Sequence, residues 1–433
     1  MLSSRLPKDL SPSPFFAELE RAKADVLAEC ANADALPFID MTVSSPVKAG
    51  LPVDLDDAVD EGRKAFGNWS PDAAGWKSAR EAVVEYYRER GGNFTAGQII
   101  LTASTSEAYS VLFKTFCDPG DVILTPMPGY PLLDTLAQLE HLECAPYFLK
   151  IRRENARRRA TDERRESAKF RFVLDSDSLL AAPEHAKILL LVSPHNPTGH
   201  CVSREEWNEA VLFCEENNMI LVVDEVFGDY AFSDKVSRTW QYVFDSCHPE
   251  RNEVESMDLW DAGGGDFINL PENGPKCPIF WLNGLSKAVG SPQLKLGWMA
   301  FYAPRENFEE IRAALEFVED AYLSVSAPAQ ALGISLLPKA AAYELRVRER
   351  LLTNWQTLRE AFPSKYCPEV LGGWYAVVRL GEDDEELTLR LLREKHVLVQ
   401  PGFFFDFDED GWVVMSLLQD PAIFKEAIQR IKQ

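Results

Sequence analysis

The chain has 433 residues, 46% of them hydrophobic, so it exceeds the size that one hydrophobic core usually organises. We therefore expect two domains. The formal net charge of -23 at pH 7 argues against general binding of nucleic acids or anionic membranes, because an acidic surface repels both.

The predicted elements begin with an N-terminal arm, residues 1–52, that shows no core pattern of its own. We expect this arm to pack against a smaller C-terminal domain or against a partner subunit. Beyond the arm, short β-rich runs alternate with helical patterns, which is typical of an α/β fold with a mostly parallel sheet covered by helices. The β-rich runs are residues 98–102, 121–125, 186–192, 219–223, 278–282 and 296–302.

Ser104, Thr105 and Ser106 follow the first of these runs and open a helical pattern that continues to Phe116. Hydroxyl groups and free N–H groups at a helix N-terminus bind a phosphate well. The same residues can equally be an ordinary N-cap with Glu107 in the first turn. The segment is a candidate phosphate site if a phosphate-bearing group binds nearby.

Two segments interrupt the alternation. Residues 150–171 are dense in Arg and Glu, which favours a solvated helix or loop with ion pairs over a site for an anionic partner. Residues 233–275 contain three consecutive glycines and scattered acids, and predict a surface excursion.

The last part of the chain predicts a smaller α+β domain. Helical patterns dominate beyond residue 302 as far as about residue 361, and strands are predicted at 370–380 and 412–418. We place the large domain at residues 53–320 and the small C-terminal domain at 321–433.

The cysteines and the start of the chain predict a cytoplasmic protein without a metal site. The eight cysteines include no C-x-x-C pair and lie scattered, as expected of reduced thiols. Residues 1–14 mix charges with Ser and Pro, and no apolar run approaches membrane-spanning length.

Three polar residues stand at the ends of later β-rich runs, in the order Asn196, Asp224 and Lys287. Each alone has a simpler explanation, as a turn residue, a loop carboxylate or a solvated lysine. Because ligands bind at the carboxyl ends of strands in open α/β sheets, we expect the three to lie close together. The three residues together therefore indicate a ligand site more strongly than any one of them does alone.

An amide, a carboxylate and an amine in this setting are what pyridoxal phosphate (PLP) requires. A lysine amine forms a Schiff base with the cofactor and later moves protons at the substrate Cα. A carboxylate keeps the pyridine nitrogen protonated, so that the ring accepts an electron pair from Cα. An amide donates to the ring oxygen beside the aldehyde without adding charge. With this cofactor, the phosphate interpretation of residues 104–106 is favoured.

The chain resembles the class I and II aminotransferases of PLP fold type I over nearly its whole length. Further landmarks of the resemblance are Pro71, Gly75, Tyr86, Tyr87, Asp118, Pro119, Gly120, Asp121, Pro128, Gly129, Tyr130, Pro131, Gly372, Gly373, Trp374 and Tyr375. The resemblance implies that Lys287 is the catalytic Schiff-base lysine, Asp224 the pyridine partner, Asn196 the ring-oxygen donor and Tyr130 the aromatic that stacks on the ring. It also implies a homodimer with shared active sites.

Several residues around the expected cofactor depart from the family pattern. Phe227 stands where the family usually carries Tyr, so one hydrogen-bond donor to the ring oxygen is missing. Lys295 replaces an Arg and keeps the charge without the bidentate fork. Gly284 replaces a Ser, whose hydroxyl Ser286 can partly supply. Trp69 stands where an aromatic hydroxyl often reaches the partner subunit's phosphate, and its indole N–H is a possible donor.

Near the C-terminus, Val414 stands where family members acting on α-amino acids carry an Arg that binds the substrate carboxylate. An apolar residue cannot hold a carboxylate, so either another cation does so or the substrate is not a plain α-amino acid. Ser45 and Lys48 of the arm are candidate substrate residues, and Arg379 is less favoured. Lys48 can equally be a solvated loop lysine.

The leading interpretation is a PLP-dependent aminotransferase that moves an amino group from an amino acid to a 2-oxo acid by a ping-pong mechanism. Residues 284–298 are similar to alanine-type aminotransferases, and the aromatic set of Trp374, Tyr375 and residues 403–405 fits either an apolar donor pocket or ordinary core. A PLP lyase or decarboxylase on the same fold is an alternative. A non-catalytic PLP-binding protein is another, although no basic DNA-binding domain precedes the fold.

Overall fold

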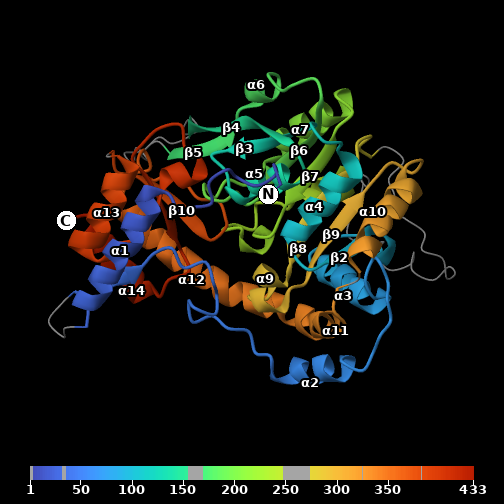
Figure 1. Cartoon of the computed structure of the whole chain (residues 1–433), viewed down its shortest axis with the longest axis horizontal. Coiled ribbons are helices and arrows are strands. Elements are labelled where there is room, and N and C mark those ends of the chain that lie inside the picture. Colours follow the sequence, from blue (N-terminus) through green and yellow to red (C-terminus); the bar gives the residue numbers. More distant parts are fainter. Residues whose placement is uncertain (1–2, 32–35, 155–168, 247–273, 324, 382) are drawn as a thin grey trace, which may run out of the picture.

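A computed structural model describes residues 3–31, 36–154, 169–246, 274–323, 325–381 and 383–433. Its centre is an eight-stranded sheet in the order β2-β9-β8-β7-β6-β3-β4-β5 (Figure 1). The strands are β2 (Ile99–Thr102), β3 (Val122–Met127), β4 (Glu143–Glu154), β5 (Lys169–Leu174), β6 (Ala186–Val192), β7 (Ile220–Asp224), β8 (Ile279–Gly284) and β9 (Gly297–Tyr302).

The five central strands from β4 to β8 are parallel, whereas β5, β9 and β2 pair antiparallel with their neighbours. This mostly parallel sheet confirms the α/β prediction. Strands buried on both faces form continuous apolar runs, as residues 188–191 do. The predicted runs differ from the strands by only one or two residues at their ends, and Asp224 is the last residue of β7 rather than the first residue after it.

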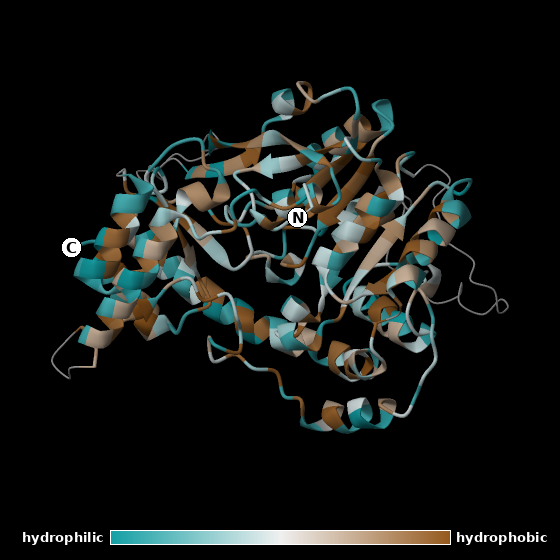
Figure 2. Ribbon diagram, viewed as in Figure 1, coloured by the Kyte–Doolittle hydropathy of each residue, from teal (hydrophilic) through white to brown (hydrophobic). Residues whose placement is uncertain are grey.

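Alternate strand residues enter two separate hydrophobic cores, one on each face of the sheet. On one face, Ile188, Leu190 and Phe280 pack with α4 (Thr105–Phe116), α5 (Leu132–Leu139) and α10 (Phe308–Tyr322). The other face packs with α3 (Lys77–Arg88), α7 (Arg204–Glu216) and α8 (Thr239–Ser246). The central strands accordingly carry the brown, hydrophobic colour in Figure 2. Helices cover both faces because both faces are apolar.

The C-terminal part contains a three-stranded antiparallel sheet in the order β10-β13-β12. Its elements are α12 (Ala340–Ala361), β10 (Tyr375–Arg379), α13 (Asp384–Lys395), β11 (Val397–Leu398), β12 (Gln400–Pro401), β13 (Trp412–Ser416) and α14 (Pro421–Ile431). Val414 is completely buried in β13. The helices and the small antiparallel sheet agree with the predicted α+β character of this part.

The N-terminal arm lies against the C-terminal part. In Figure 1, α1 (Pro14–Glu29) runs beside α13, where Phe15 and Leu19 pack against Leu392. The short strand β1 (Ile39–Asp40) then pairs in parallel with β11. Further along the chain, α2 (Asp56–Ala65) packs on α11 (Ala327–Leu336), where Gly62 lies close to the side chain of Leu332. The arm is therefore attached to the C-terminal part, through α1 and β1, before the chain enters the large sheet.

The two interrupting segments are partly regular structure. Residues 150–154 extend β4 and residues 169–171 begin β5, and the two strands form an antiparallel pair. The predicted helix or loop is wrong there, because abundant charges hide the period-two apolar pattern of residues 170, 172 and 174. Residues 155–168 lie outside the described residues. The predicted surface excursion is wrong for α8, whose Trp240 is fully buried, and residues 247–273 are not described.

Two kinds of feature are absent from the described ranges. None of their helices is both long enough and apolar enough to cross a membrane. The same ranges bring together no group of three or more His, Cys, Asp or Glu side chains that could hold a metal ion.

Candidate active site

A cavity of about 340 Å³ opens at the carboxyl edge of the large sheet. It is reached by the ends of β6, β7 and β8, because parallel strands deliver the residues that follow them to one edge. Most of the residues predicted to hold a cofactor line it together. They are Ser104, Thr105, Ser106, Tyr130, Asn196, Asp224, Ser286, Lys287 and Lys295.

Lys287 lies in the short helix α9 (Leu285–Ala288), directly after β8. Its Nζ atom is 4.6 Å from the ring centre of Trp374 and 5.5 Å from that of Phe227, and both rings are buried. Burial lowers the pKa of the amine to about 8, although the negative charge of Asp224 partly offsets this. A substantial fraction of the amine is therefore neutral and nucleophilic near pH 8.

Asp224 is held by two hydrogen bonds. The Tyr109 hydroxyl donates to Oδ2 at 2.7 Å, and the Val226 N–H group donates to Oδ1 at 3.0 Å. Burial raises the pKa of the carboxyl, and the hydrogen bonds and the nearby Lys287 amine oppose that rise. Each carboxylate oxygen retains a free lone pair, so the group can accept one more hydrogen bond from a ligand cation.

The Asn196 side chain has an unsatisfied polar atom. Its Oδ1 atom is buried and has no hydrogen-bond partner among the described residues. Such an atom normally costs stability unless something satisfies it. The amide can present its oxygen or, when turned over, its NH₂ group, so it fits the polar edge of a ligand in the cavity. The backbone around it is fixed, since the His195 N–H group donates to the His200 carbonyl at 2.7 Å.

The start of α4 lines the same cavity as Lys287. Ser104 is the N-cap, and its Oγ atom accepts a hydrogen bond from the Glu107 N–H group at 3.2 Å. The capping interpretation is therefore correct for Ser104, but its own O–H and the first N–H groups of the helix stay available to an anion. A Cβ atom on Gly297 would come within 3.1 Å of the Ser104 backbone, so glycine permits this close approach.

Other predicted residues do not line the cavity. Trp69 is 76% exposed, and Lys48 is also exposed. Ser45 lies one residue beyond Ser44, which does line the cavity. Arg379 is occupied elsewhere, in an ion pair with Glu409 at the far end of β10. Of the described lining residues, only two are cationic, Lys287 and Lys295.

Sequence reasoning missed Tyr109 and Ser44, whereas Tyr375 belongs to the aromatic set for which a pocket was one of two interpretations, and it does line the cavity. Tyr109 had a usable signal, since it lies one helical turn after Thr105 and thus on the same face of α4. Of the aromatic set, Phe403 packs edge-on against Phe15 and Phe404 stacks on Phe16, with ring centres 5.4 Å and 4.6 Å apart.

Comparisons with known proteins identify the family of the chain. A family model, aminotransferase class I and II, matches residues 54–431. A tyrosine aminotransferase from Caenorhabditis elegans is 23% identical over 376 residues, which cover 85% of this chain and 71% of that protein. The glutamate-pyruvate aminotransferase AlaA from Haemophilus influenzae is 24% identical over 376 residues, covering 83% of this chain and 81% of that protein.

Solved structures share the fold. An aminotransferase from Escherichia coli superposes with a TM-score of 0.74 at 19% identity, covering 100% of this chain and 97% of that one. An alanine aminotransferase from Pyrococcus furiosus gives a TM-score of 0.71 at 22% identity, with 98% of both chains covered. At these identities the likeness establishes the fold, and the family model spans most of the sequence. The chain belongs to the class I and II aminotransferases, and it is a transaminase.

Proposed function

We propose that the protein is a PLP-dependent aminotransferase that moves an amino group from a small or apolar amino acid to a 2-oxo acid in a ping-pong cycle. One observation carries the proposal: a lysine amine with a pKa lowered to about 8 shares a cavity with a carboxylate held by two hydrogen bonds. Such an amine can bond to a carbonyl carbon and can then exchange a proton near neutral pH.

The residues present fit PLP in both charge and hydrogen bonding. Ser104, Thr105, Ser106, Ser286 and Lys295 would hold the phosphate, Asp224 the ring nitrogen, Asn196 the ring oxygen, Tyr130 the ring face and Lys287 the aldehyde carbon. When bound, PLP supplies an electron sink for the pair left on the substrate Cα. The unsatisfied amide oxygen of Asn196 and the uncovered N–H groups of α4 are consistent with such an occupant.

The protein's own groups then have defined tasks. Lys287 carries the proton that leaves the donor Cα. Asp224 keeps a proton on the ring nitrogen, and Tyr109 keeps the carboxylate oriented. The rings of Phe227 and Trp374 keep water away from the amine, which favours its neutral form.

The remaining lining supports a donor with an uncharged side chain. Leu132, Leu133 and Val226 are apolar, and both described lining cations have tasks at the cofactor. A second carboxylate on the donor would therefore lack a partner, and a buried unpaired charge is costly. We propose that Ser45 and Lys48 contribute to binding the donor's α-carboxylate from the arm, next to Ser44.

A spectroscopic single turnover tests the function. The protein is purified with PLP and mixed with separate amino acids, without an acceptor. Conversion of the visible band to that of the pyridoxamine form by an apolar donor, reversed by a 2-oxo acid, is the expected result. Release of CO₂ or of a cleaved carbon fragment would instead support a lyase or decarboxylase. An unchanged band with every donor would support a non-catalytic PLP protein.

We also propose a homodimer. Phe66 and Trp69, which follow α2, are 79% and 76% exposed, and large exposed aromatics of this kind often mark an interface. Light scattering should give twice the chain mass, and Trp69→Ala should weaken PLP retention if the indole reaches the neighbouring site. A monomer at micromolar concentration would refute the dimer.

A further inference from the structure

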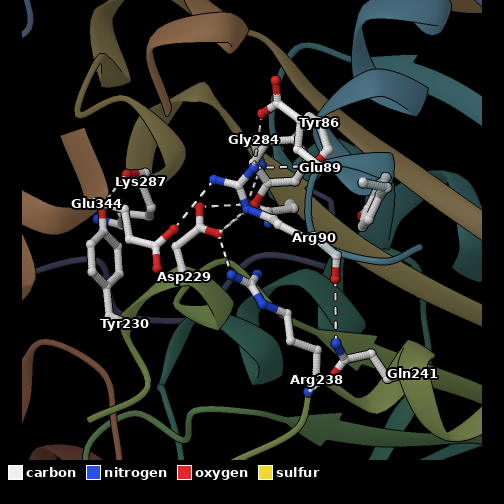
Figure 3. Close-up of polar contacts among 12 residues, drawn as sticks. Tyr86, Glu89, Arg90, Asp229, Tyr230, Arg238, Gln241, Gly284, Lys287 and Glu344 are labelled. Carbon is white, nitrogen blue, oxygen red and sulfur yellow. Dashed lines mark hydrogen bonds and ion pairs between the residues drawn. The ribbon is translucent and has the colours of Figure 1, made fainter. Parts of the chain in front are cut away.

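A buried ion cluster lies next to the Lys287 turn (Figure 3), and its residues do not line the cavity. Its centre is Asp229, whose side chain is 1% exposed. The Arg238 guanidinium donates to Asp229 Oδ1 at 2.6 Å, and the Arg90 guanidinium donates to the same atom at 3.0 Å. The Tyr86 hydroxyl lies 2.8 Å from Oδ2. Burial alone would raise the pKa of Asp229, but the two guanidinium groups hold it below its usual range.

One arm of hydrogen bonds leads from this cluster to the residues before Lys287. The Tyr86 hydroxyl accepts a hydrogen bond from the Asn283 side-chain NH₂ group at 3.2 Å. The Asn283 Oδ1 atom in turn accepts from the Gly284 N–H group at 2.7 Å. Asn283 and Gly284 are the last two residues of β8, so the arm fixes the point where the chain turns into α9.

A second arm reaches Lys287 itself. Tyr230, the neighbour of Asp229, is completely buried, and its hydroxyl donates to the Lys287 carbonyl at 2.6 Å. The Tyr230 ring also packs on Trp374, with ring centres 5.2 Å apart, and Trp374 faces the Lys287 amine. Because α9 has only four residues, few of its backbone groups find partners within the helix. The Gly290 N–H group also donates to the Lys287 carbonyl, but at 3.4 Å, so the Tyr230 hydroxyl is the closer donor to this carbonyl.

We propose that Tyr230 is a positioning residue that fixes the main chain of Lys287, and that the Asp229 cluster anchors Tyr230 and Tyr86 as two supports of the same turn. The cluster is anchored in turn to α12, because Arg90 also contacts Glu344 at 3.3 Å. The proposal rests on the proposed role of Lys287. Tyr86, Asp229 and Tyr230 do not line the cavity. Loosening the turn that they support should move the Lys287 amine toward water.

The test compares Tyr230→Phe with Tyr147→Phe. Tyr147 is also buried, and its hydroxyl donates to the Leu190 carbonyl at 2.9 Å, so this control loses a similar bond without touching the Lys287 turn. The apoproteins are mixed with PLP at pH 6 to 10, and the rate of covalent binding is followed by absorbance. For the wild type the rate should rise with pH to a midpoint near 8, because the neutral amine is the nucleophile.

Tyr230→Phe should raise that midpoint by at least about 0.5 unit, since a more solvated amine has a higher pKa. Its kcat should fall roughly tenfold with KM for the donor nearly unchanged, whereas Tyr147→Phe should leave the midpoint in place. Tyr86→Phe, which leaves the Arg–Asp229 pairs intact, should shift the midpoint in the same direction. Equal midpoints in Tyr230→Phe and Tyr147→Phe would overturn the positioning role. Failure of the wild type to bind PLP covalently would instead overturn the proposed function itself.

Discussion

The cavity is built from two kinds of region that differ in charge and in how firmly they are held. The residues at the carboxyl edge of the sheet include all the described lining charges, and buried contacts fix Asp224 and the Lys287 turn. The residues brought by the arm and by the C-terminal part, Ser44 and Tyr375, are uncharged, and Ser44 is exposed. We therefore expect the sheet edge to carry the chemistry of the proposed reaction and the second region to contribute to donor selection.

The largest effect should come from the sheet edge. Lys287→Ala should lower transamination by more than about 10³-fold, because it removes both the covalent attachment and the proton carrier. The visible band should change to that of free PLP, measured by absorbance after desalting. Lys295→Ala should keep the covalent band and weaken only PLP affinity. A variant of Lys287 that kept most of the activity would show that the two regions do not divide the work in this way.

Asp224→Asn should come next, with kcat reduced by about 10²–10³-fold, because the ring nitrogen loses its ionic partner. Tyr109→Phe removes only one hydrogen bond to that carboxylate, worth about 1 kcal/mol, and should cost roughly fivefold. Steady-state kinetics on one donor would compare the two. Equal losses would mean that orientation of the carboxylate, and not its charge, is what matters.

In the second region, Lys48→Ala should raise KM for the donor about tenfold and change kcat little, as expected for the loss of one charge-assisted hydrogen bond. Lys235→Ala, which changes another exposed lysine in a turn, serves as the matched control. If KM stayed the same in both variants, Lys48 would be only a solvated side chain, and the hydroxyls of Ser44 and Tyr375 would be the next residues to replace.

The smallest effect should come from Phe227→Tyr. Phe227 lines the cavity, and a hydroxyl there can donate to the cofactor ring oxygen. Because a hydrogen bond to a charged form favours that form, the pH midpoint of the visible band should fall by about 0.5–1 unit. A pH titration of the loaded protein measures it. A midpoint that stays in place or rises would show that the hydroxyl does not reach the ring.

The sheet-edge region was largely predictable from the sequence, and the second region only in part. Asn196, Asp224 and Lys287 follow apolar runs, and a parallel sheet must bring such positions to one edge. Tyr230 gave no signal, because its partner is a backbone carbonyl 57 residues away in sequence. The charge-rich residues 150–154 concealed a strand, since their exposed charges outnumber the apolar residues that define its face. Lys48 was expected at the substrate and Trp69 at a partner subunit's phosphate, and neither lines the cavity within a single chain.

The pairing of β1 with β11 has a consequence for protein engineering. Met41, three residues before Ser44, donates its N–H to the Leu398 carbonyl at 2.9 Å and accepts at its own carbonyl from the Ser416 N–H group at 2.7 Å. The cavity wall at Ser44 is therefore attached to the C-terminal sheet through the backbone. A chimera intended to change donor choice should exchange the arm and the C-terminal part together, because a graft of either alone would join strands that did not evolve as a pair.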